Sequence, residues 1–233
     1  MSLINTIHAL AIVGFTACAL HAGDDLVVPE TLTKEQKDKL QAFLRGHTTP
    51  EHYVPRGAKF VDEKPTAIEE EIKATKDKPI KQYTVQITPH RAVPDSETVN
   101  KADVYYYRPN PEKGKQGLTI KYTVDLTTGQ PLGEPEVMLK AHTPISRDEL
   151  AEAVEMAKSE SPAYKTLAAG RDPKAVRWEY LQMKVNRKNN GLEPGDRVIR
   201  LVFTANANEN EPNPAPVRII VNLTKGTVLA DDR

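Results

Sequence analysis

The chain has 233 residues, and its 32 Lys and Arg residues balance 32 Asp and Glu residues, so the formal net charge is zero. Nucleic acid binding by phosphate neutralisation needs a basic stripe or a polybasic block, and here the cations are interleaved with acids throughout. This composition argues against nucleic acid as a partner, and 39% hydrophobic with 27% charged residues is typical of a water-soluble protein. The length accommodates two small domains of roughly 100 residues each.

Residues 1–22 have the pattern of a secretory signal peptide. An uncharged apolar run, Ala9–Leu20, is too short to span a bilayer and is followed by Gly23 and two acidic residues. No Lys or Arg precedes the run, which departs from the usual signal pattern. Cleavage after Ala22, or after Ala19, would release the mature protein. We therefore expect an exported protein, periplasmic or secreted.

Cys18 offers an alternative reading of this segment. The letters "FTAC" resemble a bacterial lipobox, in which the cysteine becomes the lipidated first residue, although Phe15 stands where Leu is usual. Residues 1–17 would then be a lipoprotein signal, and lipid attached to Cys18 would be the one link to a membrane. Because Cys18 is the single cysteine, the exported body is expected to have no disulfide framework and no thiolate metal site.

The first helix is predicted after a short tether, residues 23–32. Thr33 and Gln36 fit a capping box, and Gly46 stands where a helix would end. Between them, Leu40, Phe43 and Leu44 form an apolar stripe at helical spacing.

Weaker signals follow this helix. A proline-punctuated loop contains a short strand candidate at residues 58–61. The segment "TAIEEEIKATK" is a second helix candidate, with Ile68 and Ile72 one turn apart. Four strand candidates complete the first half: "KQYTVQIT", "ADVYYYR", "LTIKYTVDL" and the short "QPL".

The second half repeats this order. Ser146 and Glu149 form a capping box at the start of a helix in "PISRDELAEAVEMAKS", and the short helical piece "PAYKTLAAG" follows. The strand candidates are then "AVRWEYLQMKV", "VIRLVFT", "VRIIVNL" and "TVL". Each half therefore reads as a helix followed by strands.

The two halves can be aligned directly. Shifting residues 104–132 by 97 positions superposes them on 201–229 without a gap, and five of the last twelve residue pairs are identical. The preceding strand candidates, "PIKQYTVQI" and "AVRWEYLQM", align at an offset of 96. We predict a tandem duplication with two α+β domains, residues 33–140 and 141–233. The sequence leaves open whether residues 33–65 complete the first domain or form an arm.

The repeated "LTxG" predicts the same hairpin turn in both halves. A three-residue hairpin loop ends in a residue with positive φ, which glycine adopts without a Cβ clash. Gly129 and Gly226 are therefore predicted to be structural turn glycines. Pro131 cannot donate to a ladder, so "QPL" should lie at a sheet edge or stop pairing there.

Both halves of the chain resemble domains of one protein family. The second copy, with "HTPISRDELAEAVEMAKS", the corner Arg171–Asp172 and "PVRIIVNLTKGTVLADDR", resembles the third amino-terminal domain of copper-containing amine oxidases. The first copy, ending "IKYTVDLTTGQPL", is similar to the domain before it. The resemblance covers roughly residues 66–233 and rests on order and spacing. It implies two cystatin-like domains, each a helix cradled by an antiparallel sheet, which are non-catalytic in that family.

The chemistry of that family resides in another domain, which holds topaquinone in an Asn-Tyr-Asp/Glu context and copper on three histidines, two of them in His-Xaa-His. None of the eight tyrosines has such neighbours, and no His-Xaa-His occurs. We therefore predict no catalytic, cofactor-binding or metal-binding residue and no enzymatic activity. The chain is expected to act by protein binding or packing. The alternative is an accessory subunit that completes a separately encoded amine oxidase in the oxidative deamination of primary amines.

Other candidate sites are weak. His47 and His52 flank Glu51 in a loop rather than sharing a helix face, and His90 and His142 stand at element ends, so solvated or hydrogen-bonded roles are favoured over metal binding. "GLEPGDR" is typical of a surface turn. Asn222 begins the tripeptide Asn-Leu-Thr, which matches a glycosylation sequon, but its place at the hairpin end disfavours modification.

Aromatic residues indicate where a partner would bind. In a strand, Tyr106 faces away from Tyr105 and Tyr107, whereas Trp178 shares a face with Tyr180. The set that is exposed would mark an interface rather than a catalytic pocket. The partner would be an unidentified protein, with an amine oxidase catalytic domain or a second copy of the chain as the candidates.

Overall fold

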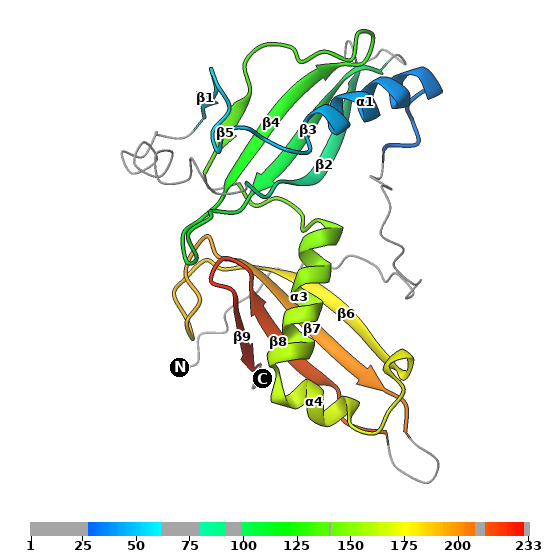
Figure 1. The fold of residues 1–233 in the computed structure, drawn as a ribbon, viewed down its shortest axis with the longest axis vertical. Helices are drawn as coiled ribbons and strands as arrows, with labels where there is room; N and C mark the ends of the chain where they lie inside the picture. The colour runs from blue at the N-terminus through cyan, green and yellow to red at the C-terminus, as the bar shows by residue number, and fades with distance from the viewer. Residues whose placement is uncertain (1–27, 62–79, 92–98, 140, 208–212, 231–233) are drawn as a thin grey trace, which may run out of the picture. The chain divides into compact units, whose positions relative to one another are not determined.

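The computed structural model describes residues 28–61, 80–91, 99–139, 141–207 and 213–230, and it shows a mixed α+β protein (Figure 1). The chain divides into two compact units, a first unit of Ala22–Glu149 and a second unit that includes Leu150–Arg233. The expected signal peptide and the helix candidate around Ile68 lie outside the described residues.

The first unit contains a five-stranded sheet in the order β1-β5-β4-β3-β2. Strands β2 to β5 pair antiparallel with their neighbours, and β1 pairs parallel with β5. The strands are β1 (Lys59–Phe60), β2 (Tyr83–Arg91), β3 (Val99–Arg108), β4 (Leu118–Asp125) and β5 (Glu136–Met138).

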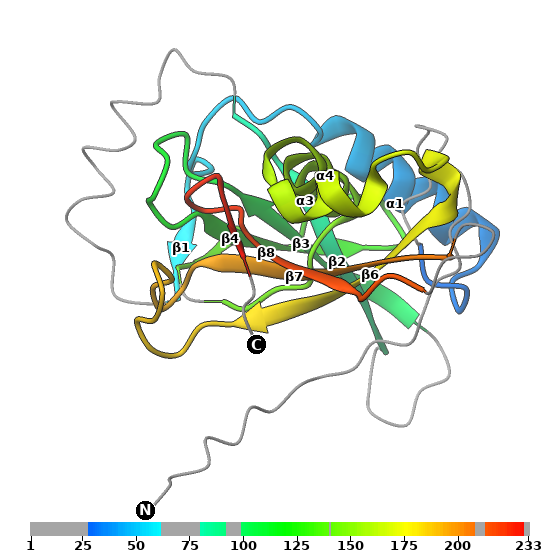
Figure 2. The same ribbon diagram turned by 90° about the horizontal axis from the view of Figure 1, so that it is seen from below.

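Helix α1 (Lys34–Gly46) lies across one face of this sheet (Figure 2). It begins at the expected capping box, in which the Thr33 side chain accepts from the Gln36 amide and the Gln36 side chain accepts from the Thr33 amide. The apolar stripe of α1 and Tyr53, from the following loop, are buried in one core with β3 and β4. Residues 33–61 therefore complete the first unit and do not form an arm.

The second unit contains a four-stranded antiparallel sheet in the order β6-β7-β8-β9. Helix α3 (Arg147–Glu160), which begins three residues before the boundary between the units, and α4 (Pro162–Ala168) lie on one face of the sheet (Figures 1 and 2). A short 3-10 helix, η1 (Pro173–Ala175), leads into β6. The Ser146–Glu149 capping box is formed, with hydrogen bonds of 2.9 and 3.1 Å. The strands are β6 (Val176–Lys184), β7 (Arg197–Ala205), β8 (Val217–Asn222) and β9 (Thr227–Ala230).

Strand β7 buries apolar side chains on both faces of this sheet. On the helix-covered face, the ring of Phe203 meets Tyr164 of α4 edge-on, with ring centroids 4.8 Å apart. On the opposite face, Val198 is buried in a smaller cluster with Leu192 and Ile220. Burial on both faces explains why "VIRLVF" and "RIIVNL" read as almost continuous hydrophobic runs.

The central hairpins of the two units have the same register. Val104 pairs with Tyr122 in the first unit, and Leu201 pairs with Ile219 in the second, each 97 residues further along the chain. A hydrogen bond at the open end of each hairpin is also repeated, because the Leu126 amide donates to Asn100 O and the Leu223 amide to Arg197 O, both at 2.9 Å.

The first strand of each unit departs from the expected offset of 96. Val104 pairs with Ile87 and Leu201 with Tyr180, so β2 and β6 correspond at an offset of 93 along this part of the sheet. A β-bulge between Thr84 and Gln86 accounts for one residue of this departure, because beyond it the offset is 94. The sequence alignment of these two strands was therefore wrong by two to three residues.

The repeated turn is one residue longer than expected. The Asp125 amide donates to Gln130 O, which encloses a four-residue loop, and the pair Asn222–Thr227 encloses a loop of the same length. Gly129 and Gly226 both end their loops with positive φ, at 74° and 61°. Beyond the turn, Pro131 forms a single bridge with Val124, and pairing with β4 resumes only in β5.

Candidate functional site

The structure does not bring the histidine candidates together. His47 caps the end of α1, where Nδ1 lies 2.8 Å from Phe43 O and the ring stacks on Phe43. The Nε2 atom of His52 accepts a 2.9 Å hydrogen bond from Arg56 Nε. Among the described residues, no group of three His, Cys, Asp or Glu side chains is arranged to hold a metal ion.

His90 and Asp103 form a separate pair on β2 and β3. Nε2 of His90 lies 2.8 Å from Asp103 Oδ2, and Thr123 Oγ1 donates to Asp103 Oδ1 at 2.7 Å. Thr123 contacts the aspartate rather than the histidine, so the three side chains do not form a nucleophile–base pair. His142 is exposed in the loop before α3. These positions support structural roles.

A buried arginine, which the sequence did not single out, organises the interior of the first unit. Arg108 Nη1 donates to His52 O at 2.6 Å and Tyr53 O at 2.8 Å, and Nε donates to Gln82 Oε1 at 2.5 Å. Burial lowers the pKa of Arg108, and burial raises the pKa of Tyr106 beside it. Strand alternation already places Arg108 on the same face as Tyr106, and that face is the buried one.

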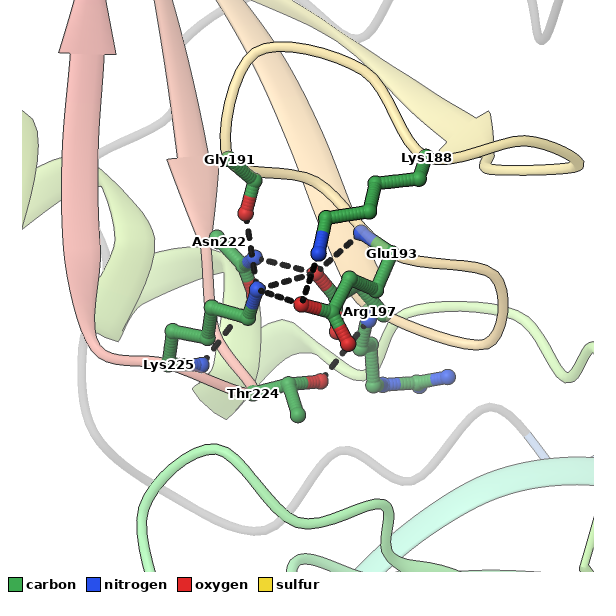
Figure 3. A network of polar contacts seen from close by, with 8 residues as sticks. Lys188, Gly191, Glu193, Arg197, Asn222, Thr224 and Lys225 are labelled. Carbon is green, nitrogen blue, oxygen red and sulfur yellow. Dashed lines mark hydrogen bonds and ion pairs between the residues drawn. The ribbon is translucent and has the colours of Figure 1, made fainter.

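Lys225 lies at the centre of a polar network in the second unit (Figure 3). Its Nζ donates to Gly191 O at 2.8 Å, pairs with Glu193 Oε1 at 3.2 Å and lies 3.7 Å from Asp196 Oδ2. The hydrogen bond and charge of Lys225 lower the pKa of Glu193. The lysine therefore ties the β8–β9 turn to the loop before β7, the loop that the sequence presented only as a surface turn.

The sequon residues belong to the same network. Asn222 is fully buried, and its Nδ2 donates to Asp196 Oδ2 at 2.6 Å. Its Oδ1 accepts from the Lys225 amide at 3.1 Å, while Thr224 Oγ1 accepts from the Arg197 amide at 2.8 Å. Attaching a glycan to this nitrogen would require the network to open, so Asn222 serves the fold.

The two aromatic sets differ in exposure. Tyr106 and Tyr107 are buried and Tyr105 is partly buried. Trp178 is partly buried on β6, and Tyr180, two residues on, keeps 38% of its surface exposed. Of the two sets, the β6 set is therefore the one that offers an aromatic side chain to a partner.

Strand β6 is also the most regular of the sheet edges in the described part of the chain. It pairs with β7 over nine consecutive residues without a register shift and contains no proline. Its equivalent, β2, has two register irregularities and Pro89. The remaining edges, β1 and β9, have two and four residues. Irregular or short edges resist pairing with another chain, whereas a long regular edge is a template for it.

The β6 edge carries charge as well as aromatic side chains. Arg177 and Glu179 are exposed on one face of the strand, and Trp178 and Tyr180 lie on the other. We call residues Val176–Tyr180 the β6 edge segment. In strand addition, main-chain hydrogen bonds give affinity and contacts with alternate side chains give specificity, and the β6 edge segment presents an edge backbone together with exposed side chains.

No described helix is long and apolar enough to cross a membrane. No protein-family model and no curated protein matches the chain. The resemblance to the amine oxidase domains therefore rests on the residues that carry it.

Proposed function

We propose that the chain is a non-catalytic, exported protein-binding protein, built from two tandem cystatin-like units like the amino-terminal domains of copper amine oxidases. It binds an extended protein segment along the β6 edge segment. The observation that carries this proposal is the nine-residue regular ladder of β6 at a sheet edge, with Tyr180 exposed on it.

The physical basis is strand addition. The amide and carbonyl groups of an edge strand that point away from the sheet can pair with an incoming strand, which supplies affinity, while exposed side chains select the partner. Tyr180 provides apolar area with a polar hydroxyl, a combination enriched at protein interfaces.

Photo-cross-linking tests this site. With p-benzoylphenylalanine in place of Tyr180 in the full chain, irradiation in an extract of the native source should give an adduct whose cross-linked peptide is identified by mass spectrometry. Leu132, 49% exposed in the first unit, is the matched control position and should give none. Equal labelling at both positions, or none at Tyr180, would contradict the proposal. A cross-link to an amine oxidase catalytic domain would identify the chain as an accessory subunit.

The non-catalytic part of the proposal has its own test. The purified protein with added copper should consume no oxygen when offered a panel of primary amines, and it should retain no stoichiometric copper after dialysis. A control amine oxidase in the same assay verifies the substrates. Amine-dependent oxygen uptake would mean that the histidines form a site after all.

Export is tested at the amino terminus. The mass of the protein recovered from its native source should correspond to cleavage after Ala22 or Ala19, or to a lipid-modified Cys18. Recovery of the chain with its first 22 residues intact would contradict export.

A further inference from the structure

We infer that the partner at the β6 edge segment is a second copy of this chain, paired antiparallel with Trp178 facing Trp178 of the second copy. This inference rests on the proposed function, because it names the occupant of the same edge. It follows from symmetry and from the order of charges along β6.

Symmetry restricts how β6 can pair with itself. In an antiparallel ladder, directly opposite residues lie on the same face of the sheet. A two-fold axis perpendicular to the sheet keeps every residue on its own face, so the axis must pass beside one residue that faces its own copy. Each possible register is therefore specified by its central residue.

Charge distinguishes these registers. Centring on Arg177 or on Glu179 places like charges directly opposite, which is destabilising. Centring on Tyr180 places Arg177 opposite Met183 and leaves the charges unpaired. Centring on Trp178 places Arg177 of each copy opposite Glu179 of the other. Among these four, only the Trp178 register forms opposite-charge pairs, and it forms two of them.

The same register is favourable on the other face of the strand. There Trp178 meets its copy at the axis, and Val176 lies opposite Tyr180 on both sides. Aromatic–aromatic and aromatic–β-branched pairs are among the favourable cross-strand neighbours. The exposed ring of Tyr180 is thus covered, and the two four-stranded sheets become one continuous sheet.

The charged residues also disfavour unintended pairing. A charged edge resists non-specific strand addition, and Arg177 and Glu179 admit a neighbour whose charges run in the complementary order. The antiparallel copy of the same five residues meets that requirement. Because the paired segment is short, the dimer should be weak and concentration-dependent.

Charge reversal with rescue tests the inference. Sedimentation of the full chain carrying Cys18→Ser, up to about 1 mM, should show a monomer–dimer equilibrium. Arg177→Glu and Glu179→Arg should each weaken dimerisation about tenfold or more, because each creates two like-charge pairs, and the double variant should restore it. Both residues are exposed, so circular dichroism should confirm an unchanged fold. A chain that stays monomeric, or a double variant that is not restored, overturns the inference.

Cysteine cross-linking tests the register. In the Cys18→Ser chain, Trp178→Cys should form a disulfide-linked dimer on mild oxidation, because the two side chains face each other across the axis. Tyr180→Cys should not, because it lies opposite Val176. Cross-linking at 180 and not at 178 overturns the register. A monomeric chain that still gives an adduct with another protein from Tyr180 would overturn the second-copy inference while leaving the proposed function intact.

Discussion

Gly129 is required at its position for two separate reasons. Its φ of 74° lies in the left-handed region, where an L-residue places its Cβ against the backbone. A Cβ on Gly129 would also lie 3.3 Å from Lys39 Cβ on α1. The glycine therefore permits both the turn and the close approach of the helix.

Replacement of this glycine should be costly. We expect Gly129→Ala to lower the free energy of unfolding by about 1–2 kcal/mol, measured by chemical denaturation. Gly46→Ala is the matched control, because a Cβ there meets nothing within 4 Å, and it should be neutral or slightly stabilising. Equal effects of the two substitutions would show that the turn does not need its glycine.

The repeated turn is anchored by a different lysine in each unit. In the first unit, Lys39 of α1 donates to Thr127 O and pairs with Glu35 at 2.7 Å. In the second unit, the turn supplies its own Lys225, which reaches Gly191 O at 2.8 Å. Position 225 corresponds to Thr128, so the turn is repeated while its attachment is not.

Loss of the second anchor gives a prediction with a matched control. Lys225→Met should lower the free energy of unfolding by about 1 kcal/mol, because Gly191 O loses its donor and the buried Asp196 loses an ion-pair partner. Lys188→Met should change it little, because the Lys188 side chain is 78% exposed and 3.7 Å from Glu193, whereas that of Lys225 is 24% exposed. Similar losses would contradict the central position of Lys225.

Lys225→Met should also change how the stability of the fold depends on acid pH. The folded-state pKa of Glu193 is lowered, so the stability from its pairing with Lys225 is present above the reference value of 4.5 and is lost as pH falls through the folded pKa. The stability difference between the unaltered chain and Lys225→Met should therefore narrow below that pH. A stability difference that widens in acid would contradict the stabilising role of the ionised Glu193.

At the scale of elements, α1 is an integral part of the first unit. Leu40 is fully buried, and it belongs to one core cluster with strand residues such as Ile120. Removal of a buried leucine side chain loses its transfer energy and leaves a cavity.

Substitutions on the buried face and on the exposed face of α1 should differ in their effect on stability. Leu40→Ala should lower the free energy of unfolding by about 2–5 kcal/mol in urea titration. Gln41→Ala, on the exposed face, should leave it within about 0.5 kcal/mol. A small effect of Leu40→Ala would mean that α1 is only loosely docked.

Local signals predicted these elements well. Both capping boxes are formed, because each depends on two side chains three residues apart, and the hairpin repeat kept its register over the aligned window. The bulge at Thr84 and the parallel pair β1–β5 were not predictable. The bulge inserts a residue that no residue type in the sequence marks. The β1–β5 pair joins segments that lie far apart in the chain.

Long-range polar contacts escaped prediction for the same reason. Asp196 and Asn222 are 26 residues apart, and nothing in either neighbourhood shows that they meet. Strand alternation places Arg108 on the same face as Tyr106, but it does not show that this face is buried. The carbonyl partners of Arg108 come from a loop without periodicity. Strand alternation placed Trp178 and Tyr180 on one face, but the exposure of Tyr180 depends on the edge position of β6, which the sequence did not show.

At the scale of the whole molecule, Trp178 is a built-in reporter of self-association, because it is the single tryptophan of the chain. We expect its emission maximum to shift to shorter wavelength as protein concentration rises, since pairing removes water from around the ring. Glu179→Arg should move this concentration dependence to about tenfold higher concentration or beyond, without altering the emission of the dilute protein. An emission maximum that is independent of concentration in the unaltered chain would contradict pairing at Trp178.

Strands β2 and β6 occupy equivalent edge positions in the two sheets, but their edges differ, because β2 carries the irregularities and Pro89. A chain with one receptive edge takes up one neighbour, and growth stops at two copies. If β2 had kept a ladder as regular as that of β6, each chain would join two neighbours, and addition would continue into a filament. If β6 pairs as inferred, the irregular edge of β2 limits the assembly to two copies, and the difference between these two edges prevents filament growth.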